Sequence, residues 1–235
     1  MPPPVALVTG ATRGIGRATA FALGHAGYAI GGCGRDPAAL DQLLDDLGKA
    51  GIAAAGRPAD VADPADAAAL VAHVAGRLGP VDVLVNNAGL GIFKPFAELT
   101  LEEWDRTMAT NLRSLYVVTR EVLPGMRKRG HGAVVNIASL AGRHGLAGGT
   151  AYSASKHAML GFSRSLLLEV RKEGIRVITI CPGTVDTSMM RDQSMLTPAY
   201  DRVLRSEDVA ATVVSALSLP ERALVSELDL LPTNP

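Results

Sequence analysis

Short apolar runs alternate with longer amphipathic segments along the whole of this chain. The runs of strand length lie at residues 5–8, 28–33, 52–55, 81–85, 133–137, 176–181 and 224–231. Between them, apolar residues recur three or four positions apart, as on one face of a helix, at 15–27, 37–47, 63–77, 101–122, 151–172 and from 206 onward. Strands that alternate with helices in this way form parallel βαβ units with right-handed crossovers. The pattern predicts one α/β domain over residues 1–235, a doubly wound three-layer α/β/α fold with a seven-stranded parallel sheet.

The amino-acid composition agrees with this class of fold. Of the 235 residues, 48% are hydrophobic, only 4% are aromatic, and 25 are glycine. A core of Ala, Val, Leu and Ile with closely approaching backbones suits a parallel sheet covered by helices. Lysine plus arginine and aspartate plus glutamate each number 23, and this zero net charge disfavours a nucleic-acid partner, which usually needs a basic excess.

The chain gives no sign of export, membrane insertion or metal binding. Residues 1–8 lack the basic and long apolar regions of a signal peptide, and no run of about 20 apolar residues occurs. Two cysteines do not make a disulfide framework, and the five histidines lack ligand spacing. We therefore expect a cytoplasmic protein that binds no membrane, no nucleic acid and no metal.

A glycine-rich turn joins the first predicted strand to the first predicted helix. Residues 9–16 read Thr-Gly-Ala-Thr-Arg-Gly-Ile-Gly, which spaces the glycines as G-x-x-x-G-x-G. Glycines at such a junction let backbone N–H groups approach a pyrophosphate, and the helix N-terminus adds partial positive charge. The position predicts a dinucleotide site, although an ordinary turn in a glycine-rich chain remains an alternative.

The end of the second predicted strand selects between the two nicotinamide cofactors. An acidic residue there would bind the adenosine ribose of NAD(H), whereas a basic one would accommodate the 2′-phosphate of NADP(H). Gly34 takes the selective position, Arg35 follows it, and Arg13 lies in the glycine-rich turn. These residues predict a preference for NADP(H). NAD(H) remains possible, because Asp36 lies one residue out of register.

A tyrosine and a lysine are spaced to share one helical face. Tyr152 and Lys156 are four residues apart, and a neighbouring cation should depress the pKa of the phenol and make it a usable acid or base. Ser139 follows a predicted strand, where ligands bind in open α/β sheets. Asn111 interrupts an apolar helix face, where a buried amide needs hydrogen-bond partners. An exposed surface pair is the alternative for Tyr152 and Lys156.

Taken in order, these motifs resemble those of the short-chain dehydrogenase/reductase family, in its compact single-domain branch. The residues that carry the resemblance are 9–16, 60–61, 86–89, Asn111, Ser139, 152–156 and 182–183. The family implies a Rossmann-type fold and an NADP(H)-dependent oxidoreductase that interconverts a small ketone or aldehyde and an alcohol. Two alternatives remain: a non-catalytic dinucleotide-binding regulator on the same fold, and a 3-ketoacyl-carrier reductase.

The resemblance also implies roles for individual residues. Tyr152 would exchange the proton with the substrate oxygen, and Ser139 would hold that oxygen. Lys156 would bind the nicotinamide ribose, and Asn111 would position a water of the proton relay. The implied cofactor-binding residues are Gly10, Thr12, Arg13, Gly14, Ile15, Gly16, Arg35, Asp60, Val61, Asn87, Ala88, Gly89, Tyr152, Lys156, Pro182, Gly183, Val185 and Thr187.

Further expectations concern the rim of the site and the assembly. Residues 184–205, with Met189, Met190 and Met195, are expected to form a lid over the substrate. His144 is expected to be a loop residue without a role, with a place in the substrate pocket as the alternative. The C-terminal sequence resembles members that act on hydroxy acids or on a broad range of carbonyl compounds. The family further implies a homodimer or homotetramer formed through the helices around Asn111 and Tyr152.

Overall fold

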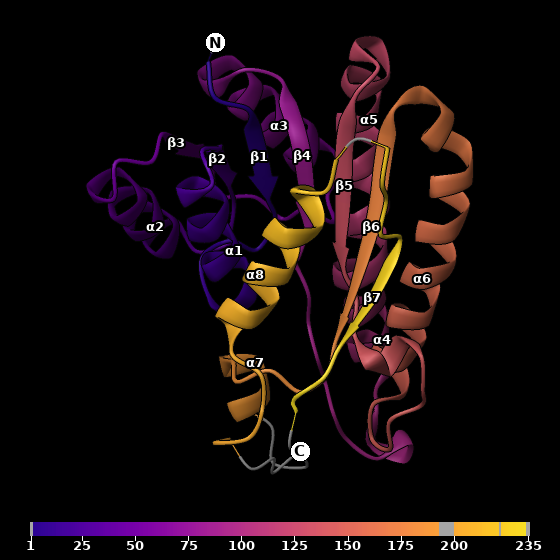
Figure 1. The fold of residues 1–235 in the computed structure, drawn as a ribbon. Helices are drawn as coiled ribbons and strands as arrows, with labels where there is room; N and C mark the ends of the chain where they lie inside the picture. Colours follow the sequence, from indigo (N-terminus) through magenta and orange to yellow (C-terminus); the bar gives the residue numbers. More distant parts are fainter. Residues whose placement is uncertain (1, 193–199, 221, 234–235) are drawn as a thin grey trace.

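The computed structural model describes residues 2–192, 200–220 and 222–233, and these ranges hold one seven-stranded sheet. All neighbouring strands are parallel, in the order β3-β2-β1-β4-β5-β6-β7 (Figure 1). They are β1 (Val5–Val8), β2 (Ala29–Gly32), β3 (Ala54–Gly56), β4 (Val81–Asn86), β5 (Gly132–Ile137), β6 (Ile175–Pro182) and β7 (Glu227–Leu230). This topology confirms the predicted fold class. The strand order reverses between β1 and β4, the place where open α/β sheets bind ligands.

Helices cover both faces of the sheet and complete the three layers (Figure 1). One face carries α1 (Gly14–His25), α2 (Pro37–Lys49) and α8 (Ser206–Leu217), and the other carries α3 (Pro64–Leu78), α5 (Ser114–Arg129) and α6 (Thr150–Val170). Alternation along β1 shows the division, because Ala6 packs with the first group of helices and Leu7 with the second. The shorter α4 (Leu101–Met108) and α7 (Ser188–Arg191) lie near the carboxyl ends of the strands.

Local side-chain chemistry explains where several helices begin. Asp36 and Asp63 each accept backbone hydrogen bonds from the first turn of the helix that follows, α2 and α3, and a proline comes next in both cases. Thr100 and Glu103 form a capping box at the start of α4. The apolar stripes therefore start at residues that satisfy the free N–H groups of a helix end.

Two expected elements differ from the structure. The last strand is four residues long rather than covering 224–231, because the ladder with β6 extends only over Glu227–Leu230. The helix expected at 101–122 is divided by a π-helical turn at Ala109–Arg113, and α5 then continues to Arg129. The wider turn shifts the phase of the apolar positions, and Leu101 at the start of the stripe is 75% exposed. A continuous apolar face from residue 101 to 122 is therefore wrong.

The described residues also bear on membrane and metal binding. Within these ranges, no helix combines the length and the apolar character needed to cross a membrane. Over the same part of the chain, no three His, Cys, Asp or Glu side chains gather as a metal site would require. Cys33 and Cys181 are buried free thiols, and burial raises the pKa of each to about 11, which keeps them protonated at neutral pH.

Candidate active site

Two adjoining hollows lie at the carboxyl ends of the strands and share Tyr152. The first is a cleft of about 430 Å³ between the glycine-rich turn and the loop after β4. Its walls include most of the residues that the sequence assigned to the cofactor, namely Gly10, Thr12, Arg13, Gly14, Ile15, Arg35, Asp60, Val61, Asn87, Ala88, Gly89, Tyr152, Lys156 and Thr187. Of the remaining four, Gly16 lies buried behind the turn, and Pro182, Gly183 and Val185 line the second hollow.

The glycine-rich turn is shaped by close backbone contacts. A Cβ atom at Gly16 would lie 2.2 Å from the carbonyl oxygen of Gly10, so only glycine fits at this position. The amide of Asn87 donates hydrogen bonds to the carbonyl oxygens of Thr9 and Gly10, at 3.0 and 3.1 Å. The hydroxyl of Thr9 accepts the backbone N–H groups of Asn87 and Ala88. These four bonds join the turn to the loop after β4 and hold both walls of the cleft in place.

The start of α1 opens into this cleft and suits an anion. Among the described residues, no side chain caps α1 at Arg13, so the N–H groups of its first turn stay available. Together with the positive end of the helix dipole, they form a site for a phosphate group. The residues present therefore fit the pyrophosphate of a dinucleotide.

The charged groups near the end of β2 favour an additional phosphate. Asp36, the residue that left NAD(H) open, caps α2 by accepting the N–H groups of Ala38 and Ala39 at 3.0 and 3.4 Å. Arg13 and Arg35 line the cleft as exposed side chains. A Cβ at Gly34 would lie 2.6 Å from the methyl group of Thr12, so an acidic side chain has little room there. The Asp36 carboxylate thus caps α2, and the two arginine side chains line the cleft.

Tyr152 and Lys156 lie one turn apart on α6, where the two hollows meet. The ammonium nitrogen of Lys156 is 5.7 Å from the centre of the Tyr152 ring and donates a hydrogen bond to the carbonyl oxygen of Ile137 at 2.8 Å. Burial lowers the pKa of Lys156 to about 8. This lysine is only 4% exposed, so its charge is held in a poorly hydrated position.

Burial also shifts the pKa of the Tyr152 phenol. It raises the pKa of Tyr152 above its ordinary value, and a hydrogen bond with Ser139 opposes this rise without reversing it. The expectation that Lys156 depresses the pKa of Tyr152 is therefore wrong. The physical reason is that Lys156 donates to a backbone carbonyl, while the loss of solvent around the phenol dominates.

Asn111 connects the π-helical turn to its surroundings. Its amide accepts the N–H of Leu90 at 2.7 Å and donates to the carbonyl oxygen of Leu90 at 2.8 Å and to the hydroxyl of Ser155 at 2.9 Å. Ser155 in turn donates to the carbonyl oxygen of Tyr152. This buried network fixes the loop after β4 against α6. Sequence reasoning missed Ser155, although its place between Tyr152 and Lys156 was a usable signal.

The second hollow is a pocket of about 620 Å³ on the other side of Tyr152. Ser139 lies in its wall beside apolar side chains, which include Phe93, Leu146, Met189, Met190, Leu231 and Pro232. The Phe93 ring packs at a tilt against Tyr152, with 5.2 Å between ring centres. His144, expected to be a loop residue without a role, lines this pocket instead. Met195 of the expected lid lies outside the described residues.

Several of these wall residues carry no motif in the sequence. Phe93 comes from the loop after β4, while Leu231 and Pro232 follow β7 at the far end of the chain. Only the folding of the sheet brings them beside Tyr152. Composition and spacing therefore could not identify them.

The chain is similar to proteins of one family along most of its length. The family model described as short chain dehydrogenase matches residues 4–196. A 3-oxoacyl-(acyl-carrier-protein) reductase of Pseudomonas aeruginosa is 38% identical over 188 residues, which cover 80% of this chain and 76% of that protein. An actinorhodin polyketide ketoreductase variant solved with NADPH is 38% identical, with a TM-score of 0.90 over 97% of this chain and 95% of that one. A metagenomic short-chain oxidoreductase in complex with NADP is 33% identical, with a TM-score of 0.85 over 99% and 98% of the two chains.

Proposed function

This chain belongs to the short-chain dehydrogenase family, and we propose that it is an NADP(H)-dependent oxidoreductase that interconverts a ketone or aldehyde and an alcohol. The observation that carries the proposal is the position of Tyr152, which lines both the dinucleotide cleft and the apolar pocket. A group placed there can exchange a proton with a substrate oxygen while the nicotinamide lies on the other side. The reaction class is thus a hydride transfer coupled to a proton transfer.

The cleft residues divide into three groups that would hold the cofactor. The glycine-rich turn and the start of α1 would bind the pyrophosphate, and Arg13 with Arg35 would bind the 2′-phosphate. Asp60 and Val61, which line the cleft, would face the adenine, and Thr187 and Val185 would face the nicotinamide, as the family resemblance implies. When bound, the cofactor supplies the hydride in reduction and accepts it in oxidation.

Each catalytic side chain has a defined task in carbonyl reduction. Because its pKa is raised, Tyr152 keeps its proton at neutral pH, and its O–H can donate that proton to the substrate oxygen. The hydroxyl of Ser139 donates a hydrogen bond to the same oxygen, which holds the carbonyl at the end of the phenol. The ammonium group of Lys156 stabilises the phenolate left behind, and the Asn111 network holds α6 in register with the loop after β4.

Replacement of Tyr152 by phenylalanine tests this proposal. Tyr152→Phe should lower NADPH-dependent turnover by about 100-fold or more while leaving NADPH binding by fluorescence titration nearly unchanged. The matched control is Tyr28→Phe, which removes a hydroxyl from a side chain packed against the core on the α1 side. Retained turnover in Tyr152→Phe would rule out its acid–base role.

A 3-ketoacyl-carrier reductase is the second candidate function, favoured by the similarity to the Pseudomonas aeruginosa reductase. It differs from the main proposal in its substrate, a thioester presented on a carrier. A comparison of acetoacetyl thioesters with simple ketones, followed by NADPH absorbance, separates the two. A non-catalytic regulator is disfavoured, because Tyr152, Lys156 and Ser139 line the two hollows and Asn111 bonds to Ser155 between Tyr152 and Lys156, as an enzyme of this family would need.

We also propose that the segment 184–205 acts as a lid over the pocket. Its base is closed by hydrogen bonds that join Leu204 to Thr184 and to Asp186, at 3.0 and 2.8 Å. Met189 and Met190 line the pocket from α7. Methionine side chains repack easily, which suits a cover for varied apolar groups. Protection of Arg191 from trypsin on addition of NADPH and substrate would support closure.

The assembly is proposed to be a homodimer or homotetramer built on α5 and α6. Tyr116 on α5 and Leu168 on α6 are 50% and 67% exposed, so each of these helices presents apolar surface that a second subunit could cover. Light scattering after size exclusion measures the mass directly. A cytoplasmic location remains a proposal that is consistent with two buried free thiols.

A further inference from the structure

The pocket beside Tyr152 holds almost no charge. Among the described residues that line it, only His144 and Tyr152 have side chains that titrate, and none is Asp, Glu, Lys or Arg. The hydroxyl groups nearby are uncharged: Ser139 accepts the N–H of Ala141 and keeps its O–H for the substrate oxygen, and the Thr187 hydroxyl donates to the carbonyl oxygen of Val185. Apart from Thr184 and His144, the remaining wall is aliphatic, aromatic or thioether.

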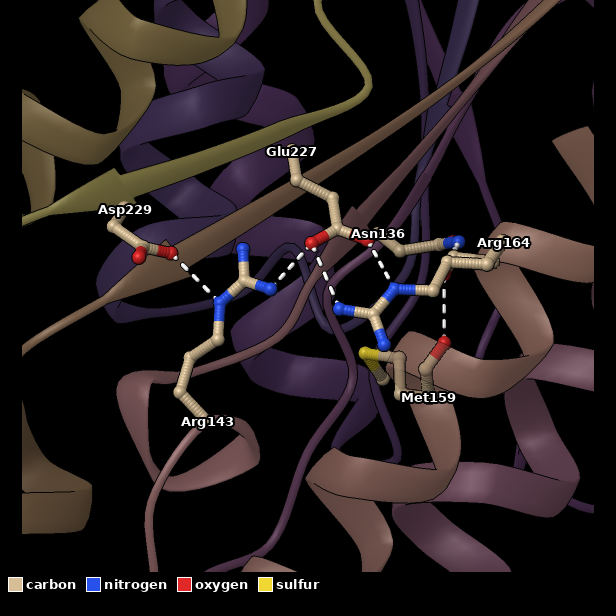
Figure 2. Close-up of polar contacts among 7 residues, drawn as sticks. Asn136, Arg143, Met159, Arg164, Glu227 and Asp229 are labelled. Atoms are coloured by element: carbon tan, nitrogen blue, oxygen red, sulfur yellow. Dashed lines mark hydrogen bonds and ion pairs between the residues drawn. The ribbon is translucent and has the colours of Figure 1, made fainter.

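Arg143, which is next to this wall in the sequence, forms ion pairs with two carboxylates. Arg143, directly before His144, donates from Nη1 to Glu227 and from Nε to Asp229, the latter at 3.0 Å. Arg164 of α6 also binds Glu227, at 2.6 and 3.1 Å, so Glu227 lies between two guanidinium groups (Figure 2). The two positive charges of the arginines and the two negative charges of Glu227 and Asp229 therefore sum to zero. We call these four residues the Glu227 cluster.

The charges of the Glu227 cluster are paired with one another, so the cluster has a structural role and does not bind a ligand. The side chains of Arg143 and Glu227 are only 21% and 19% exposed. The bonds to Arg164 and Arg143 hold the pKa of Glu227 below its ordinary range, so its charge persists at neutral pH. An incoming substrate carboxylate would have to displace one of these partners to reach Arg143.

Among the described residues, α7 adds no cation to the wall of the pocket. Arg191 of α7 makes a bidentate pair with Asp186, with both contacts at 2.6 Å. The wall formed by the described residues therefore offers no unpaired cation to an anion.

We propose that the substrate is an uncharged carbonyl compound with an apolar substituent, and that the pocket discriminates against keto acids. The inference rests on the proposed function of the same site. An anion that leaves water without a new partner loses much of its solvation free energy, whereas an apolar group gains by leaving water. The C-terminal sequence suggested two classes of substrate, hydroxy acids and a broad range of carbonyl compounds. The charge distribution of the pocket favours the carbonyl compounds.

The test compares acetoacetate with its methyl ester and its amide, which share the reacting ketone and differ in charge. With NADPH and the unmodified enzyme, kcat/KM should be about tenfold or more higher for the better of the two neutral compounds. Equal or better use of acetoacetate would overturn the inference. If the enzyme turns over none of a wider set of ketones and aldehydes, the proposed function itself is wrong.

Two variants of one pocket residue sharpen the comparison. Met190→Lys introduces a cation, and the preference for the neutral compounds should fall about fivefold or more, whereas the uncharged Met190→Gln should leave the ratio nearly unchanged. Arg143→Gln should also leave the ratio unchanged. If Arg143→Gln or His144→Gln selectively removes activity toward acetoacetate, that residue binds the carboxylate and the inference is overturned.

Discussion

The ammonium group of Lys156 lies 5.7 Å from the centre of the Tyr152 ring, yet its hydrogen bond goes to the carbonyl oxygen of Ile137. Burial therefore acts on the two groups in parallel: it lowers the pKa of the lysine to about 8 and raises that of the tyrosine. Both side chains are driven toward their neutral forms. In the proposed reaction, proton transfer to a substrate would leave a phenolate that the Lys156 charge stabilises, so the rate would depend on the lysine pKa.

The first prediction concerns the pH dependence of reduction. We expect kcat/KM for the carbonyl substrate to fall as the pH rises past about 8, because Lys156 then loses its proton. Lys156→Arg should move this fall to higher pH, since arginine stays charged, even if its maximal rate is lower. Lys172→Met, on an exposed turn after α6, serves as the control and should keep the original profile. An unshifted profile in Lys156→Arg would assign the titration to another group.

The same pKa shift predicts the opposite trend for stability. The folded protein holds Lys156 at a pKa of about 8 against an ordinary value of 10.5, so between these values the unfolded chain binds more protons. The contribution of Lys156 to the free energy of unfolding should therefore rise with pH across this window. Urea denaturation at several pH values measures it, and Lys156→Met should remove this component of the slope. A component of equal size in that variant would contradict the assignment.

The second prediction addresses the cofactor phosphate. Arg13→Gln combined with Arg35→Gln should raise KM for NADPH by about tenfold or more and leave KM for NADH nearly unchanged, because only NADPH carries the 2′-phosphate. The control Arg120→Gln removes an exposed arginine of α5 and should alter neither constant. An equal rise in KM for NADPH and NADH would show that the two arginines contact a part of the cofactor other than the 2′-phosphate.

The third prediction uses the close approach of backbone at the glycine-rich turn. Gly16→Ala places a methyl group 2.2 Å from the carbonyl oxygen of Gly10, so the turn must open and NADPH binding should weaken by about 100-fold or more. Gly48→Ala is the matched control, because a Cβ at Gly48 meets open space within α2. That change should leave binding intact and keep or slightly raise the melting temperature. Normal NADPH affinity in Gly16→Ala would contradict the geometry.

The fourth prediction concerns the Glu227 cluster. Glu227→Gln leaves Arg143 and Arg164 without a shared carboxylate, and we expect a loss of about 1–3 kcal/mol in the free energy of unfolding. Because the pKa of Glu227 is lowered in the folded state, its stabilising effect is present above the ordinary carboxyl range and is lost as the pH falls through the folded pKa.

The Glu227 cluster also joins two walls of the pocket, since His144 follows Arg143 and Leu231 lies two residues after Asp229. Glu227→Gln should therefore raise KM for the carbonyl compound more than it lowers kcat. The control is Glu102→Gln, an exposed residue of α4 for which neither quantity should change. Unaltered stability and KM in Glu227→Gln would show that the cluster is not structural.

Much of the fold and of the site could be read from short-range patterns. Helix and strand periods repeat within a few residues, so the apolar runs predicted the parallel α/β sheet that the structure contains. The glycine-rich turn and the Tyr152 to Lys156 spacing are local in the same sense, and the structure brings both to one cleft. The π-helical turn at Ala109–Arg113 escaped prediction, because apolar residues continue three and four positions apart across it, at 104, 108, 112 and 115, as they would in an unbroken α-helix.

What the sequence by itself determined is therefore the architecture and the place of the dinucleotide turn, and it predicts which side chains react. The tertiary structure decided the rest: the direction in which burial shifts the pKa of Tyr152, the use of Asp36 as a helix cap, and the neutral pocket closed by residues from opposite ends of the chain. Periodicity and turn chemistry act over a few residues. Desolvation and ion pairing depend on neighbours such as Arg143 and Asp229, which are 86 positions apart and meet only in the folded protein.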